Sequence, residues 1–386
     1  MEYPNIWAEV DLAAIAHNLK ELSASSPGAG LMAVVKADAY GHGAVAVARK
    51  ALSSGAHSLG VARLDEALVL REAGISAPIL IFGYTHPEHA ETLAVHGITQ
   101  TVYSRRIAEE MSRRLAASGR TVAVHVKIDT GMGRLGLVPD ALLAGARDLA
   151  ADHDALSDVR AIAGLPGLSL EGIMTHLACA DCADQTHART QLSTFRSFLE
   201  ALDLPGSPPL VRHAANSAAI IDLPEAHLDM VRAGIALYGL LPSGEMRMGD
   251  VRLRPAMALK TRVTYLKRVP AGFTVSYGAT FVTRAPTTIA AISAGYADGY
   301  DRRLSSRGHV LIRGKRAPIA GRVCMDQTLV DVGNIPDVAL DDEVVLMGSQ
   351  GEDAITAEEI AETLSSINYE VVSTIMHRVP RIYRNA

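Results

Sequence analysis

The stretch SLGVARLDEALVLREAGISAPILIFG, residues 58–83, contains one complete strand–helix–strand unit. Two short apolar runs, 58–62 and 78–83, flank residues 64–73, which are rich in the helix formers Ala, Leu, Arg and Glu. Two strands joined through such a helix run parallel, because the helix carries the chain back to the end of the sheet where the first strand began. The stretch therefore predicts a parallel sheet covered by helices.

The same unit repeats across the first 240 residues. Short apolar, β-branched runs that we interpret as strands occur at 31–36, 58–62, 78–83, 97–103, 121–129, 168–176, 210–214 and 228–234. Eight β/α repeats in about 210 residues predict an α/β fold of the (β/α)8 TIM-type barrel class. An open, doubly wound sheet is the alternative.

A change of pattern after this point indicates a second domain. Residues 240–250, LLPSGEMRMGD, introduce Pro and Gly, and residues 257–269 alternate with the period of a strand. In 309–321 a Gly-Lys turn joins two strand-like arms. We predict a barrel domain over 1–239 and a mainly-β C-terminal domain over 240–386.

Composition narrows the class of protein. Lys and Arg total 37 against 42 Asp and Glu, a net charge of −5, which disfavours nucleic acid as a partner. Three cysteines are too few for a disulfide framework and suit a reducing compartment. No apolar run approaches the roughly 20 residues that span a bilayer, and the first basic residue is Lys20, so no secretory signal is expected. We predict a cytoplasmic protein without membrane contact.

Lys36 is the first candidate catalytic residue, because the active sites of barrels lie at the C-terminal ends of their strands. It ends the run AVVK and precedes the glycine-containing loop 37–43. A lysine at the end of a buried strand has a lowered pKa and a free amine that can form an imine. A surface lysine with a snorkelling side chain is the structural alternative.

Three charged residues lie at the end of a second predicted strand. Lys127 and Asp129 close the run 121–129, and Arg134 follows. The planar guanidinium of Arg134 can grip a carboxylate or phenolate, although Lys127 would repel it unless neutralised. The alternative is a surface cluster of ion pairs.

His176, Cys179, Cys182 and His187 have a spacing that resembles a zinc site. The segment follows a barrel strand and contains Asp181 as a competing group, and the sequence has no second CxxC pair. We therefore predict no metal.

The last predicted strands supply features that suit a phosphate. Gly234 and Ile235 follow Arg232 at the turn after the eighth strand, and Asn216 and Ser217 follow the seventh. Barrels bind phosphate at these loops, through backbone N–H groups. With an imine-forming lysine and an arginine inside the barrel, the set matches the needs of pyridoxal phosphate. A simple helix-entry turn is the alternative for the glycine.

Six blocks of sequence resemble one known family. They are AVVKADAYGHG, HVKIDTGMGRLG, VRAGIALYG, VSYGAT, GRVCMDQ and RVPRIY, spread over residues 33–383. The chain is similar in them to the bacterial alanine racemases, which are fold-type III pyridoxal phosphate enzymes. The resemblance implies interconversion of L-alanine and D-alanine by two bases, supplying D-alanine for peptidoglycan.

The resemblance also implies a role for each matching residue. Lys36 holds the cofactor and is one base, and Tyr277 is the other, provided by the second subunit of a head-to-tail homodimer. The expected phosphate ligands are Tyr40, Ser217, Gly234, Ile235 and Tyr369. His176 is expected beside the cofactor ring and Arg232 opposite its nitrogen.

Further implied roles concern the substrate. Arg134 and Met325 are expected to bind its carboxylate, Arg134 also contacting the phenolic oxygen of the cofactor, and Lys127 matches a position that is carbamylated in many members. The expected entrance corridor consists of Asp181, Tyr296, Arg302 and Arg322. The expected absence of a secretory signal favours alanine over the broader substrate range of the related periplasmic racemases.

Two other functions share parts of this pattern. Basic amino acid decarboxylases also join a barrel to a β domain, but an acid faces the cofactor nitrogen there, and Arg232 argues against that class. Single-domain cofactor carriers would leave residues 240–386 unexplained.

Overall fold

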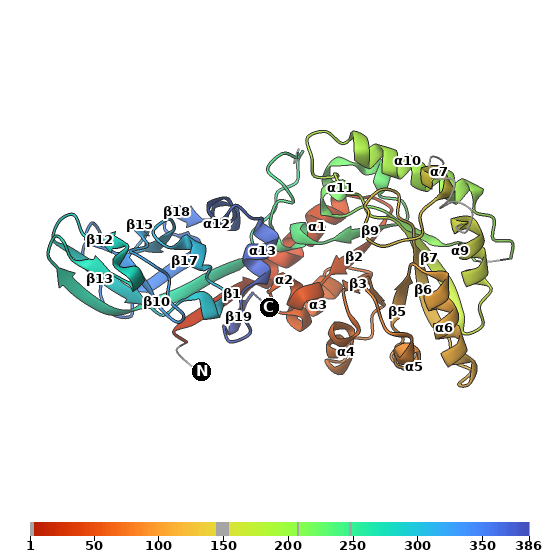
Figure 1. Cartoon of the computed structure of the whole chain (residues 1–386), viewed down its shortest axis with the longest axis horizontal. Coiled ribbons are helices and arrows are strands. Elements are labelled where there is room, and N and C mark those ends of the chain that lie inside the picture. The colour runs from red at the N-terminus through yellow and green to blue at the C-terminus, as the bar shows by residue number, and fades with distance from the viewer. Residues whose placement is uncertain (1–3, 144–153, 207, 247–248, 386) are drawn as a thin grey trace. The chain divides into compact units, whose positions relative to one another are not determined.

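The computed structural model describes residues 4–143, 154–206, 208–246 and 249–385. The chain divides into two compact units, which we treat separately (Figure 1). The barrel unit comprises Ile15–Ala39 and Ala44–Leu253, and the β unit comprises Met1–Ala14, Tyr40–Gly43 and Arg254–Ala386.

Eight parallel strands form a nearly closed barrel, in the order β8-β7-β6-β5-β4-β3-β2-β9. Their bounds are β2 Gly30–Val34, β3 Ser58–Val61, β4 Ile79–Ile81, β5 Thr99–Val102, β6 Val122–Lys127, β7 Leu168–Met174, β8 Val211–His213 and β9 Met230–Ala233. Backbone hydrogen bonds link the two outermost strands, from Asp229 N to Arg212 O and from Arg232 N to Ala215 O, each 3.1 Å. The predicted fold class is confirmed, and each predicted strand overlaps an observed one.

Helices surround this sheet (Figure 1). They are α1 Leu12–Ser25, α3 Ala44–Ser53, α4 Leu64–Glu72, α5 Ala90–Val95, α6 Arg105–Ala116, α9 Ala155–Ala163, α10 Thr186–Ala201 and α11 Ser217–Asp222. Met32, Leu80, Met174 and Met230 come from four different strands and pack as one buried cluster, as expected for a barrel whose interior is filled by side chains. Among the helices of the described ranges, none has both the length and the apolar character needed to cross a bilayer.

The β unit is built around one long strand. β10 (Met257–Val269) pairs antiparallel with β1 (Ile6–Asp11), β13 (Thr287–Ile292) and β17 (Glu343–Gln350). The remaining strands are β11 Thr274–Val275, β12 Phe281–Val282, β14 His309–Ile312, β15 Lys315–Pro318, β16 Thr328–Asp331, β18 Asp353–Ile355 and β19 Arg381–Arg384. The predicted hairpin is present, but its two turn residues are Arg313 and Gly314 instead of the expected Gly-Lys pair, because Lys315 already pairs with Ile312. Both turn residues have positive φ, as tight hairpin turns require. The helices of this unit are α12 Ala357–Leu364 and α13 Asn368–Ser373.

The division into units differs from the predicted boundary between residues 239 and 240. β1 belongs to the β unit, where it lies between β10 and the C-terminal strand β19. Residues 40–43 also belong to the β unit, whereas residues 240–253 belong to the barrel unit. The pairing of β1 could not be predicted, because an alternating strand does not encode the identity of its partner.

The interior of the barrel is expected to be sensitive to loss of volume. Leu80→Ala removes a side chain that is 2% exposed, which should lower the free energy of unfolding by about 2–5 kcal/mol in urea titrations. Val69→Ala on α4, where the side chain is 50% exposed, is the matched control and should change it by about 0.5 kcal/mol or less. Equal effects of the two variants would contradict a packed interior at Leu80.

Candidate active site

Lys36 lies immediately beyond β2, at the start of a left-handed turn. Residues 37–40 all have φ between 51° and 54°, and none is glycine. An L-residue in this conformation costs about 1–2 kcal/mol, so four in succession persist only where their surroundings enforce them. The predicted strand therefore ends at Val34, and Lys36 belongs to the turn, labelled α2 (Lys36–Tyr40).

Two carboxylates hold this turn in place. Glu66 on α4 accepts a hydrogen bond from Ala37 N at 2.5 Å, and Asp38 accepts one from Ala44 N at 2.7 Å. Glu66 also accepts from Ala62 N at 2.7 Å, so a single side chain ties the loop after β3 to the loop after β2. On the other side of Lys36, Val35 N donates to Gly60 O at 2.8 Å, so the backbone is held both before and after this lysine.

Four basic side chains act on one another at this end of the barrel. Burial, and then the charge of Arg134, lower the pKa of Lys36. Burial followed by Arg134 and Arg232 lowers the pKa of Lys127 to about 8. Burial and the same four cations depress the pKa of His176 well below its ordinary value. The structure therefore brings these five predicted residues together in a field that favours anionic ligands.

Asp129 orders the loop that carries Arg134. Its Oδ1 accepts hydrogen bonds from the backbone of Gly131, Met132 and Gly133 at 2.9–3.1 Å, and its Oδ2 accepts from Arg134 N at 3.0 Å. Burial would raise the pKa of Asp129, but these four bonds outweigh it and leave the pKa lowered. The carboxylate is therefore a loop anchor, and the predicted alternative of a surface ion-pair cluster does not describe it.

Arg232 is buried on β9 and donates to four acceptors. Its Nη1 bonds to His213 Nδ1 at 2.9 Å, and its Nη2 bonds to Ala214 O, Thr175 O and His176 Nδ1 at 2.8, 3.0 and 3.1 Å. Because arginine can only donate, both imidazoles must accept through Nδ1, which makes them neutral with the proton on Nε2. Burial, and then Arg134, lower the pKa of Arg232 to about 9, so it stays charged at neutral pH.

The hydrogen-bond chain continues from His213 to a third histidine, His125, and sequence reasoning missed both of these residues. His213 Nε2 lies 2.9 Å from His125 Nδ1, so the proton on His213 defines the donor and His125 accepts. Burial, and then the charge of Arg232, lower the pKa of His125 to about 4. A signal was available, since His125 precedes Lys127 by two residues and therefore lies on the same face of β6.

The predicted phosphate residues of the barrel unit also meet. Ser217 begins α11, and its Oγ accepts hydrogen bonds from Gly234 N at 2.9 Å and Ala236 N at 3.3 Å. Asn216 caps α11 by accepting from Ala219 N at 3.1 Å. Residues after the seventh and eighth barrel strands thus converge on one hydroxyl, at the place where barrels bind phosphate.

The four residues with the spacing of a zinc site do not gather as metal ligands in the structure. His176 is bonded to Arg232, and His187 Nε2 lies 3.1 Å from Gly131 O. Within the described ranges, His, Cys, Asp and Glu side chains nowhere gather in threes that could hold a metal ion. Asp181 lies in the turn between the two cysteines of this segment.

The remaining predicted residues lie in the β unit. Ser276 Oγ donates to Arg322 O at 2.6 Å, so the turn carrying Tyr277 rests on the segment that leads to Met325. Tyr296 N donates to Cys324 O at 3.0 Å, which joins the same segment to a second loop. Tyr277 and Met325 are 70% and 53% exposed. This face of the unit therefore presents apolar groups to solvent.

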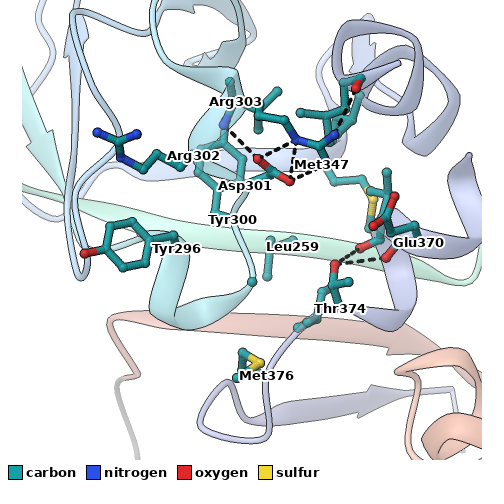
Figure 2. A pocket seen from close by; sticks show the side chains of 16 residues that line it. Leu259, Tyr296, Tyr300, Asp301, Arg302, Arg303, Met347, Glu370, Thr374 and Met376 are labelled. Carbon is teal, nitrogen blue, oxygen red and sulfur yellow. Dashed lines mark hydrogen bonds and ion pairs between the residues drawn. The ribbon is translucent and has the colours of Figure 1, made fainter. Parts of the chain in front are cut away.

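A pocket in the β unit adjoins two entrance candidates (Figure 2). It has a volume of about 310 Å³, and Tyr296 and Arg302 contribute to its wall. Figure 2 shows both side chains extending to the same side, away from the ion pair between Asp301 and Arg303, whose closest atoms are 2.8 Å apart. The two predicted entrance residues therefore share one surface.

Tyr40 and Tyr369 are also neighbours in the β unit. Their ring centroids are 6.2 Å apart and their planes are inclined by 50°. Burial raises the pKa of Tyr40, so its hydroxyl remains a hydrogen-bond donor at neutral pH. Two of the residues predicted to bind phosphate are thus neighbours, and α13 provides one of them, Tyr369.

Comparisons with known proteins identify the family. Residues 10–242 match the family model for the alanine racemase N-terminal domain, and residues 256–383 match that for the C-terminal domain. The chain belongs to the alanine racemase family. It is 54% identical over 380 residues to the alanine racemase of Desulfosudis oleivorans, covering 98% of this chain and 96% of the relative.

Solved structures agree with this assignment. The alanine racemase of Clostridium difficile 630 superposes with a TM-score of 0.91 at 38% identity, and that of Bacillus anthracis with bound L-Ala-P with 0.90 at 41%. Both comparisons cover 99% of this chain and 96% of the other. The predicted family and enzyme class are confirmed: the chain is an isomerase that racemises alanine.

The anchoring role of Asp129 can be tested through stability. Asp129→Asn leaves Arg134 N without an acceptor, which should lower the free energy of unfolding at pH 7 by about 1–3 kcal/mol in urea titrations. Because the folded pKa of Asp129 is lowered, its contribution is present above the unfolded pKa and is lost as the pH falls through the folded pKa. The difference between the two proteins should therefore shrink in acid.

Asp65→Asn is the control for this test, since Asp65 pairs with Arg63 at a side chain that is 66% exposed. It should change stability by about 0.5 kcal/mol or less. A loss for Asp129→Asn that did not exceed the control would contradict the anchoring role.

Proposed function

We propose that the chain racemises alanine with pyridoxal phosphate bound covalently to Lys36. The observation that carries the proposal is the position of Lys36 just beyond a barrel strand, where burial and then the charge of Arg134 lower its pKa. The other requirements of the cofactor are a partner for its ring nitrogen and donors for its phosphate. Arg232 would meet the first requirement, and the converging groups at Ser217 and Gly234 would meet the second.

Further residues complete the proposed cofactor site. The phosphate would be held by Tyr40, Asn216, Ser217, Gly234, Ile235 and Tyr369. His176 would pack beside the ring, with its Nδ1 engaged by Arg232 and its orientation therefore fixed. When bound, the cofactor acidifies the α-proton of the attached amino acid, which is the chemistry that racemisation needs.

Arg232 would shape the outcome of the reaction. At a pKa of about 9 the guanidinium remains protonated at neutral pH, so it would offer the ring nitrogen of the bound cofactor a hydrogen bond and keep its own proton. A ring that gains no proton withdraws electrons less strongly, which limits side reactions such as transamination and decarboxylation. An acid at this position would do the opposite, so Arg232 disfavours the decarboxylase alternative.

Racemisation requires a base on each face of the α-carbon, because one fixed base cannot reach both. We assign Lys36 to the proton of D-alanine and Tyr277 to that of L-alanine. Tyr277 would come from the second subunit of a head-to-tail homodimer, which would also cover the exposed Tyr277 and Met325. Its turn is held by Ser276, whose φ of 64° and ψ of −178° are strained for a residue with a side chain.

Substrate recognition would depend on charge. Arg134 and Met325 would bind the substrate carboxylate, and Asp181, Tyr296, Arg302 and Arg322 would form the entrance. A pKa of about 8 leaves part of Lys127 as a neutral amine, the form that takes up carbon dioxide as a carbamate. Carbamylation would replace a positive charge with a negative one beside Arg134. The proposal also includes a metabolic role, the supply of D-alanine for peptidoglycan, and a location in the cytoplasm.

The cofactor assignment is tested by borohydride reduction of protein loaded with pyridoxal phosphate. Peptide mapping should find the reduced cofactor on Lys36, and Lys36→Ala should abolish the label. Lys127 is the internal control, since burial beside the same cations lowers its pKa too. A label on Lys127 in the native protein would overturn the assignment. In parallel, incubation with L-alanine should give both enantiomers by chiral analysis.

The shared site is tested by mixing inactive subunits. Lys36→Ala and Tyr277→Phe proteins should each be nearly inactive, whereas a heterodimer regains both bases at one of its two sites. Random exchange makes half of the dimers mixed, so about one quarter of native activity should return. No recovery, after mass spectrometry has proved subunit exchange, would show that each subunit provides both bases.

A further inference from the structure

Cys179 and Cys182 form a pair of thiols in the barrel unit. They lie in the loop between β7 and α10, with Ala180 and Asp181 forming the turn between them. Their side chains are hydrogen-bonded to each other, and both are half-buried. The proposed racemisation uses neither thiol, so the pair calls for a separate explanation.

The loop around the pair is fixed by two glutamines. Gln191, buried on α10, accepts a hydrogen bond from Ala178 N at 2.8 Å, directly before the first cysteine. Gln185 Nε2 donates to Ala180 O at 3.3 Å, between the two cysteines. The backbone is thus held before the first cysteine and between the two, and the thiols are hydrogen-bonded to each other, so the sulfurs are neighbours, as an intrachain disulfide requires.

We propose that Cys179 and Cys182 are a redox-active dithiol, which a small-molecule disulfide such as oxidised glutathione converts reversibly to an intrachain disulfide. One cysteine thiolate attacks a sulfur of the small disulfide, whose S–S bond breaks and releases one thiol. The second cysteine attacks the mixed disulfide and expels the other thiol. Two protons and two electrons, the equivalent of two hydrogen atoms, pass from the protein to the small disulfide, which is reduced to two thiols.

The charges around the pair indicate which side of the equilibrium is favoured. The hydrogen bond with Cys179 raises the pKa of Cys182, and burial and the negative charges of Cys179, Asp181 and Glu245 raise it further. Strongly oxidising CxxC pairs have the opposite property, a stabilised thiolate that favours the reduced form. Cys182 lacks such a stabilised thiolate, so the disulfide of Cys179 and Cys182 should be the more reducing kind, which oxidised glutathione can form.

The test is peptide mass mapping of the native protein after treatment with oxidised glutathione and trapping of remaining thiols. Trypsin places Cys179 and Cys182 in peptide 161–189 and the third cysteine, Cys324, in peptide 323–378. Peptide 161–189 should become lighter by two hydrogens, and dithiothreitol should reverse the change. Cys324, whose Sγ lies 3.6 Å from Ser276 Oγ, is the internal control and should not enter an intrachain disulfide.

Single variants separate the two steps. Cys179→Ser and Cys182→Ser should both stop at the mixed disulfide and retain one glutathione, which the native protein should not do. Stable glutathione on either cysteine of the native protein would overturn the proposal. An unmodified dithiol would overturn it too, if the same glutathione mixture oxidises the urea-unfolded chain.

Discussion

The buried charge of Arg232 is the constraint around which the interior of the barrel is organised. Removing a guanidinium from water costs several kcal/mol unless close acceptors compensate. Two backbone carbonyls and the Nδ1 atoms of His176 and His213 provide them. The imidazoles can accept only while neutral, and the neighbouring cation keeps them so. The charge of Arg232 therefore fixes the tautomers of His176 and His213, and the proton on His213 makes His125 an acceptor. Each group in this chain has a fixed role as donor or acceptor.

The carboxylates near the site are also used as hydrogen-bond acceptors, and this helps to explain why the site is positively charged. Asp129 gives its carboxylate to four backbone groups, and Glu66 gives its own to the turn after Lys36 and the loop after β3. These acids fix the backbone beside Arg134 and Lys36, and the pKa of Lys127 is still lowered by burial and then by the charges of Arg134 and Arg232. A ligand that carries a phosphate and a carboxylate would supply the missing negative charge. The site therefore favours anions for two reasons. It contains several cations, and the carboxylates of Asp129 and Glu66 are bonded to the backbone.

Much of this arrangement could be predicted from sequence, and the reasons for success and failure are physical. The barrel strands were predictable because burial on both faces produces continuous apolar runs, and Lys36, Arg134 and Arg232 stand out as charges at their ends. The left-handed turn at residues 37–40 was not, because none of those residues is glycine and their conformation depends on Glu66, far along the chain. His125 escaped notice because its partner, His213, comes from a strand 88 residues later.

The place of β1 has a consequence for synthesis of the chain. β1 leaves the ribosome first, but its neighbours in the sheet are β10 and β19, and β19 is the last strand to be made. The residues of the barrel are complete long before, so the barrel can form while β1 still lacks both partners. β1 has two open edges until β10 is made, and the edge that β19 covers stays open until Arg381–Arg384 are made, so contacts between nascent chains are a hazard. The closing step of the β unit is therefore a late event, separated in time from formation of the barrel.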